Sequence, residues 1–117
     1  MYCTGMVSKE LVAASSRGIV LGVLSEGESY GYAIIQRVRE LSNESLLWTD
    51  GMLYPVLHRL EKEKVIESEW RRAENGRERK YYRLTASGRK AQAAAQLEWA
   101  TVHNTLARLW KMQPVSI

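Results

Sequence analysis

The chain has 117 residues, of which 45% are hydrophobic and 26% are charged, a composition typical of one globular domain and not of a disordered chain. Its single cysteine, Cys3, excludes an internal disulfide and a cysteine-based zinc site, and it fits a reducing, cytoplasmic location. The net charge is +4, and no apolar run approaches the roughly 20 residues of a membrane helix, so we expect no membrane segment.

The first part of the chain predicts two helices after a flexible leader over residues 1–8. Apolar residues recur with helical spacing over residues 9–24, and residues 25–28 have the composition of a turn. Glu28 or Ser29 can then cap a second helix that ends near Ser42. The apolar positions of this second helix are Ile34, Ile35, Val38 and Leu41.

A third, shorter helix follows Thr49 and Asp50, either of which can cap its first turn. We expect Pro55 near the N-terminal end of this helix, because proline lacks an amide donor. An apolar stripe consists of Leu53, Leu57 and Leu60. The opposite face is polar and carries Tyr54, His58, Arg59 and Lys62.

After residue 64 the apolar period changes from helical to two, which predicts two strands. Ile66, Ser68 and Trp70 alternate with glutamates, and Tyr82 and Leu84 alternate with polar neighbours. The Asn75-Gly76 pair between these segments suits a tight turn. The sequence therefore predicts a hairpin, with basic residues projecting from its tip: Arg71, Arg72, Arg77, Arg79 and Lys80.

Positive charge is concentrated in and around this hairpin. Between residues 71 and 90 eight lysines and arginines accompany two glutamates, a net charge of +6, so the rest of the chain carries −2. A cluster of one sign attracts polyanions, which favours nucleic acid as the partner. A basic surface with no dedicated ligand is the alternative.

The chain ends with an alanine-rich helix over residues 85–112, followed by a tail over residues 113–117. One apolar stripe consists of Trp99, Val102, Leu106, Leu109 and Trp110, and a second consists of Ala93, Leu97, Ala100 and Ala107. One small domain cannot cover both faces, so we expect the first stripe to form the interface of a homodimer. Packing of the whole helix within one monomer is the alternative.

Three helices followed by a basic hairpin are the element order of a winged helix-turn-helix. We therefore predict a mostly helical α+β fold, with a DNA-binding domain over residues 9–84 and a dimerisation helix over residues 85–112. A major groove about 12 Å wide admits the third helix, and the hairpin can contact adjacent phosphates. The predicted DNA contacts are Thr49, Tyr54, His58, Arg59, Lys62, Arg77, Arg79 and Lys80.

Three motifs, in the correct order and spacing, resemble the PadR family of transcriptional regulators. They are Tyr30-Gly31-Tyr32-Ala33-Ile34, residues 51–61 with their Leu53-Tyr54-Pro55 string, and residues 76–88 with Arg79-Lys80-Tyr81-Tyr82. The resemblance covers residues 9–112 and implies a homodimeric repressor that binds a palindromic operator in double-stranded DNA. It also implies release by a small, often aromatic, effector. The single C-terminal helix is similar to a short subgroup in which that helix forms the dimer.

The resemblance further implies where such an effector binds. Some members of the short subgroup hold flat, cationic drugs between the two subunits, stacked on a tryptophan that corresponds to Trp99. The opposite wall corresponds to Leu11, Ala14, Ser15 and Gly18 of the first helix. His103 lies one turn beyond Trp99, where a carboxylate would have favoured a cation, so neutral and anionic aromatics remain open. The alternative is that Trp99 belongs to the interface core.

No pattern in the chain indicates catalysis, a cofactor or a metal. The two histidines, His58 and His103, lie on different predicted helices without a metal-binding spacing. Phosphate-binding glycine loops and a Gly-x-Ser-x-Gly nucleophile motif are absent from the sequence. A protein that is not an enzyme is therefore expected, and the competing function is a winged-helix adaptor that binds proteins without specific DNA binding.

Overall fold

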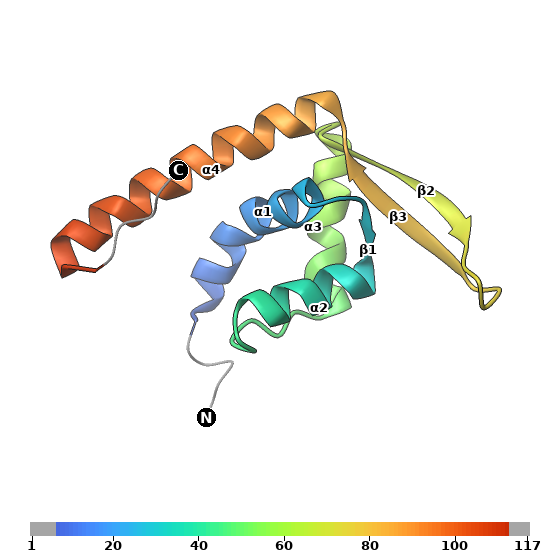
Figure 1. Ribbon diagram of the computed structural model, residues 1–117, viewed down its shortest axis with the longest axis horizontal. Helices are drawn as coiled ribbons and strands as arrows, with labels where there is room; N and C mark the ends of the chain where they lie inside the picture. The colour runs from blue at the N-terminus through green and yellow to red at the C-terminus, as the bar shows by residue number, and fades with distance from the viewer. Residues whose placement is uncertain (1–6, 113–117) are drawn as a thin grey trace.

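A computed structural model describes residues 7–112 (Figure 1). Cys3, the predicted tail over residues 113–117 and most of the predicted leader lie outside the described residues. The described part is mostly helical and contains one small sheet, as predicted for an α+β fold. Its elements are α1 (Lys9–Ser25), β1 (Ser29–Tyr30), α2 (Gly31–Leu41), α3 (Asp50–Lys62), β2 (Ile66–Arg72), β3 (Glu78–Leu84) and α4 (Ala86–Trp110).

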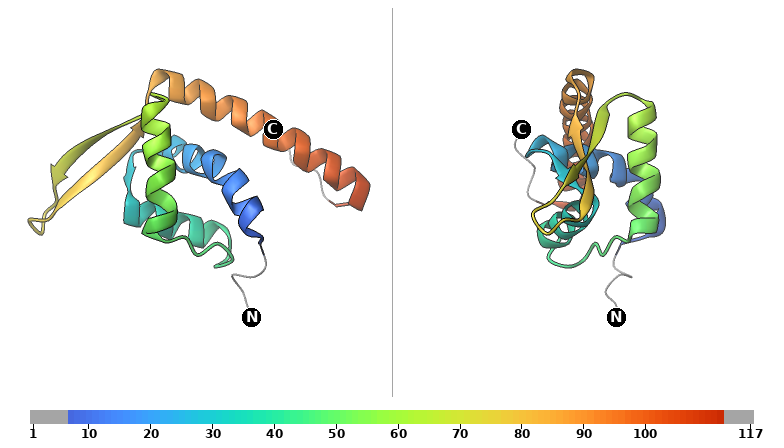
Figure 2. Two further views of the ribbon diagram at one scale, coloured as in Figure 1. Left: turned by 180° about the vertical axis from the view of Figure 1, so that it is seen from behind. Right: turned by 90° about the vertical axis from the view of Figure 1, so that its right-hand side faces the viewer.

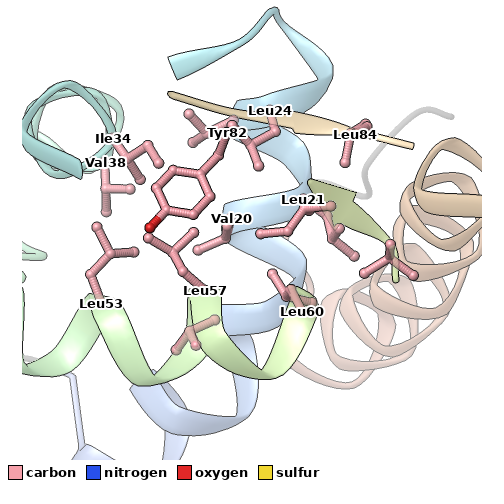
Figure 3. Packing of buried hydrophobic residues seen from close by; sticks show 14 of the residues in the cluster. Val20, Leu21, Leu24, Ile34, Val38, Leu53, Leu57, Leu60, Tyr82 and Leu84 are labelled. Carbon is pink, nitrogen blue, oxygen red and sulfur yellow. The ribbon is translucent and has the colours of Figure 1, made fainter. Parts of the chain in front are cut away.

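The core lies where α1, α2 and α3 meet the sheet (Figure 3). Leu53, Leu57 and Leu60 of α3 are at most 1% exposed, which confirms the predicted stripe. Tyr82 of β3 extends its ring between α2 and α3, and only 3% of its surface is exposed. Burial of these apolar side chains, worth about 1.5–3 kcal/mol each, fixes α3 against the other two helices.

The sheet contains a strand that the sequence did not predict. Its order is β1-β3-β2, and β1 pairs antiparallel with β3 through Ser29 and Tyr82 and through Tyr30 and Tyr81. The predicted cap of α2 at Glu28 or Ser29 is therefore wrong. Ser29 belongs to the strand, and the N-cap position is Tyr30, which makes no capping hydrogen bond through its side chain.

The β2–β3 hairpin, residues 66–84, is called the wing. It is antiparallel, with Trp70 opposite Lys80, and confirms the predicted hairpin. Gly76 adopts a φ of 84° in the turn, and the Arg77 amide donates to the Asn75 side-chain oxygen at 3.0 Å. The Asn75-Gly76 pair thus forms the turn that its residue types favour.

The start of α3 differs from the prediction. Thr49 occupies the N-cap position, but the amides of Met52 and Leu53 donate to its backbone carbonyl and its side chain makes no capping bond. Pro55 is the sixth residue of the helix, past the first turn, where its missing amide removes a helical hydrogen bond. The helix nevertheless continues to Lys62, because its apolar side chains are held in the core.

Helix α4 begins at a close contact with the wing. The Gly88 amide donates to the Thr85 hydroxyl at 3.0 Å, and a Cβ on Gly88 would lie 1.9 Å from the Val65 carbonyl oxygen. This contact fixes the rotation of α4 about its axis. Because an α-helix has 3.6 residues per turn, residues 92, 95 and 99 lie on the same face as Gly88, and this face is turned toward α1. Helix α4 consequently runs along α1 and extends beyond it (Figures 1 and 2).

The second predicted stripe of α4 is wrong in part. Ala100 and Ala107 are buried, but Ala93 and Leu97 are exposed, because the rotation set by Gly88 turns them away from α1. Ala95 is buried instead. Within residues 7–112, none of the helices has the length and apolar character needed to cross a bilayer.

Candidate nucleic-acid interface and ligand groove

A hollow of about 680 Å³ lies between the start of α2, the outer face of α3 and the wing, and we call it the wing groove. It brings together five of the predicted DNA contacts from two separate elements: Tyr54 and His58 of α3, and Arg77, Arg79 and Lys80 of the wing. Its other lining residues are Tyr30, Gly31, Tyr32, Trp70, Glu78 and Tyr82. Three arginines or lysines and one carboxylate make this hollow electropositive.

The remaining predicted contacts are on α3 but do not line the wing groove. Thr49, Arg59 and Lys62 are all exposed. Arg59 borders a different hollow of about 560 Å³, between the first turns of α1, the α2–α3 loop and α3. Thr49, the N-cap residue, and Lys62 therefore lie at the two ends of α3, and Arg59 lies on its side toward α1.

Gly31 determines where the side chain of Tyr54 can lie. A Cβ at position 31 would be 2.5 Å from the Tyr54 hydroxyl oxygen and 3.1 Å from its Cζ. The backbone of Gly31 has no positive φ, so the glycine is required for space and not for conformation. Tyr54 thus packs its ring against the first residue of α2 while 40% of its surface stays exposed.

The face of the wing that is turned away from α3 is a ladder of ion pairs. Arg71 bonds to Glu28 at 2.9 Å, and Arg83 bonds to Glu67 at 2.9 Å. Glu69 accepts hydrogen bonds from Arg71 and Arg83, which lower its pKa to about 2. Arg71 does not project from the tip as predicted, since Glu28 and Glu69 hold its guanidinium on the outer face of the wing.

The face turned toward α3 carries Lys80 among aromatic side chains. Lys80 Nζ lies 3.9 Å from a Glu61 oxygen, 6.0 Å from the Trp70 ring centre and 5.8 Å from that of Tyr82. Burial, followed by the charge of Glu61, raises the pKa of Tyr82 to about 12. Arg79 lies opposite Arg71 and is therefore on the outer face with the ladder, where it stacks over Tyr30 at 4.6 Å.

Arg77, at the tip, makes no ion pair with any residue from 7 to 112. The wing therefore has an outer face on which Arg71 and Arg83 are paired with glutamates, and an inner face that combines Lys80 with the rings of Trp70 and Tyr82. Sequence reasoning missed three aromatic residues that line the wing groove, Tyr30, Tyr32 and Trp70. The two tyrosines were visible only as part of a motif, and Trp70 had been assigned to an alternating strand pattern.

A second groove, of about 520 Å³, lies between α1 and α4. It brings together four of the six predicted effector contacts, Ser15, Gly18, Trp99 and His103, whereas Leu11 and Ala14 are exposed outside it. The other lining residues are Ile19, Gly22, Gln92, Ala95, Gln96 and Ala100, so no aspartate, glutamate, lysine or arginine borders this α1/α4 groove.

The residues of the predicted dimer interface form an apolar strip on α4. Val102 is 49% exposed, Leu109 is 70% exposed and Trp110 is 64% exposed. Trp99 lies partly in the α1/α4 groove, and Leu106 is half-buried. Met112, which the sequence pattern did not include, adds to the exposed apolar surface at the end of the helix.

The histidines lie in different grooves, His58 on α3 and His103 on α4. Across the part of the chain that the structure describes, no three histidine, cysteine, aspartate or glutamate side chains come together as a metal site would require.

The three-helix core and its wing define the class of protein as a winged helix-turn-helix protein. Residues 20–94 match the "Transcriptional regulator PadR-like family", and the chain belongs to this family of transcriptional regulators. The resemblance based on the three sequence motifs is thereby confirmed.

Similar proteins are also named transcriptional regulators. The transcriptional regulator Rv3488 of Mycobacterium tuberculosis is 37% identical over 71% of this chain and 74% of its own length. The structure of a transcriptional regulator from Clostridium thermocellum has a TM-score of 0.77 at 30% identity, covering 88% of this chain and 97% of that one. A PadR-like transcriptional regulator of Bacillus cereus has a TM-score of 0.78 at 27% identity, covering 90% and 100%.

Proposed function

We propose that this chain is a repressor that binds duplex DNA as a homodimer and is released by a small aromatic effector. The observation that carries the proposal is the wing groove, where Tyr54 and His58 of α3 adjoin Arg77, Arg79 and Lys80 of the wing. In this arrangement α3 enters the major groove and its side chains contact base edges, while the wing cations contact phosphates.

The dimer forms through the exposed strip of α4. Leu109 and Trp110 would otherwise leave contiguous apolar surface in water at the end of a long helix. This strip and the wing lie at opposite ends of the molecule (Figure 1), so the dimer leaves both copies of α3 accessible. Two copies related by a twofold axis suit a palindromic operator, whose half-sites lie about 34 Å, one helical turn, apart.

The effector binds in the α1/α4 groove against Trp99. An aromatic ring can stack on the indole, and the absence of charged side chains from the lining favours an uncharged compound. Because α4 connects the wing to the proposed dimer interface, a ligand held between α1 and α4 can favour one spacing of the two α3 helices. A ligand releases DNA only if it binds the protein more tightly when the two α3 helices have a spacing that does not fit the operator.

DNA binding is tested by incubating the purified protein with genomic fragments, beginning with its own promoter, to select a duplex. The affinity for that duplex is then measured at a series of salt concentrations. A plot of the logarithm of the binding constant against the logarithm of the salt concentration should have a negative slope, with about 0.9 for each phosphate that the protein contacts. Arg77→Ala should weaken specific and non-specific binding alike, whereas Tyr54→Ala should mainly weaken specific binding. Weak binding that is insensitive to both substitutions would favour a protein-binding adaptor instead.

A further inference from the structure

Trp70 is a residue of the wing for which the proposed function gives no role. It lies in β2, and 64% of its surface is exposed. Trp110 has the same exposure, but it belongs to the strip of α4 that the proposed dimer covers. The wing lies at the other end of the molecule in both views (Figures 1 and 2), so the same explanation does not apply to Trp70.

The position of Trp70 within the wing is informative. Strand register places Trp70 opposite Lys80 and two residues from Ser68, whose hydroxyl donates to Glu61 of α3 at 2.7 Å. Alternate residues of a strand share a face, so Trp70 is on the face of the wing that is turned toward α3. It therefore lines the wing groove together with Tyr54 and His58, on the side opposite the ion-pair ladder.

The wing groove combines two kinds of surface that a sugar–phosphate backbone also combines. The Trp70 ring supplies an apolar face, and Lys80 Nζ lies 6.0 Å from the centre of that ring. Arg77 and Arg79 line the same hollow, where Glu78 is the one carboxylate. Along a DNA strand, apolar deoxyribose faces and anionic phosphates alternate in the same way.

We infer that the wing groove holds the backbone of one DNA strand, with Trp70 packed against a deoxyribose and Lys80 on a neighbouring phosphate. The inference rests on the proposed function. If α3 lies in the major groove and the tip of the wing contacts the flanking backbone, the strand that borders the groove on that side passes between α3 and the wing. Trp70 is the exposed apolar side chain of the wing that this strand meets.

A contact with a sugar carries no base identity, so Trp70 contributes equally to every DNA sequence. A contact of this kind also adds no charge, so it leaves the salt dependence unchanged. These two properties distinguish Trp70 from Tyr54, whose loss affects specific binding, and from Lys80, whose loss makes the salt dependence less steep.

The experiment measures binding of a fluorescently labelled random-sequence duplex, about two helical turns long, over a series of salt concentrations. Trp70→Ala should weaken binding about 5- to 20-fold, in the range known for aromatic contacts with nucleic acids, at an unchanged salt slope. Trp70→Phe should retain most of the affinity. Lys80→Ala should reduce the slope by about 0.9.

Leu41→Ala is the matched control, because Leu41 is 59% exposed at the end of α2 and lies outside the wing groove. It should bind like the wild type. Unchanged affinity in Trp70→Ala would overturn the inference alone, and a reduced salt slope in that variant would reassign Trp70 to positioning Lys80. A wild-type protein that does not bind the duplex would overturn the proposed function as well.

Discussion

Both grooves place an aromatic side chain against a glycine, but the two contacts differ in how much room they leave. A Cβ on Gly31 would lie 2.5 Å from the Tyr54 hydroxyl oxygen, whereas a Cβ on Gly18 would lie 3.2 Å from Nε1 of Trp99. The first distance forces the ring to move, and the second requires a shift of only a few tenths of an ångström. Gly31→Ala would therefore displace the Tyr54 ring, whereas Gly18→Ala would shift Trp99 only slightly.

The two grooves also differ in charge. The wing groove has cations of two kinds and a single carboxylate, and the α1/α4 groove is lined entirely by apolar and uncharged polar residues, apart from His103. A small fold thus separates a surface suited to a polyanion from a surface suited to an uncharged ring.

The largest effect is expected from removing the apolar strip of α4. Leu109→Glu combined with Trp110→Ala places a charge in the proposed dimer interface, where it would be buried without a partner. We expect light scattering to show a monomer instead of a dimer, together with an almost complete loss of duplex binding. Leu41→Glu, which places a charge at an exposed apolar position elsewhere, should stay dimeric. A wild-type monomer in solution would contradict the prediction.

Gly31→Ala should displace Tyr54 and weaken binding to the selected duplex by about 10- to 100-fold, the range of one good base contact. Thermal stability should change little, because the exposed ring can swing outward. The matched control is Gly22→Ala, since a Cβ there meets no atom within 4 Å. In the Tyr54→Ala background, Gly31→Ala should have no further effect. Additive losses from the two substitutions would show that Gly31 does not act through Tyr54.

The absence of charged lining residues in the α1/α4 groove predicts a ranking of ligands. In calorimetric titrations, 2-naphthol should bind about tenfold more tightly than 2-naphthoate or 2-naphthylmethylammonium, because neither ion finds an opposite charge there. Trp99→Ala should abolish binding of 2-naphthol, and Gly18→Ala should weaken it by a smaller factor. Tighter binding of the ammonium compound would identify the groove as a cation site and refute this account.

The smallest effect concerns the ladder on the outer face of the wing. The pKa of Glu69 is about 2 in the folded protein, below its ordinary value of 4.5, so its ion pairs stabilise the fold above about pH 4.5 and lose this contribution as the pH falls toward 2. Glu69→Gln should slightly lower the thermal unfolding midpoint at pH 7 and not at pH 2. Glu74→Gln, in the same hairpin, is the control. An equal decrease at both pH values would contradict the assignment.

Much of the fold was predictable because it depends on local periodicity. Leu53, Leu57 and Leu60 repeat at helical spacing, and the two-residue alternation around Asn75-Gly76 specifies a hairpin. The same patterns identified the polar face of α3 and the basic wing, and the motifs identified the family. The pairing of β1 with β3 was not predictable, because two residues are too few to establish a period.

Two features were decided only by tertiary structure. The rotation of α4 depends on the contact between Gly88 and the Val65 carbonyl, and this contact, not the alanine pattern, determined which residues meet α1. The neutralisation of Arg71 depends on Glu28, 43 positions earlier in the chain. Composition and spacing along the chain specify which face of each element is apolar or charged, but distances between elements decide which charges are compensated and which glycines leave room for a ring.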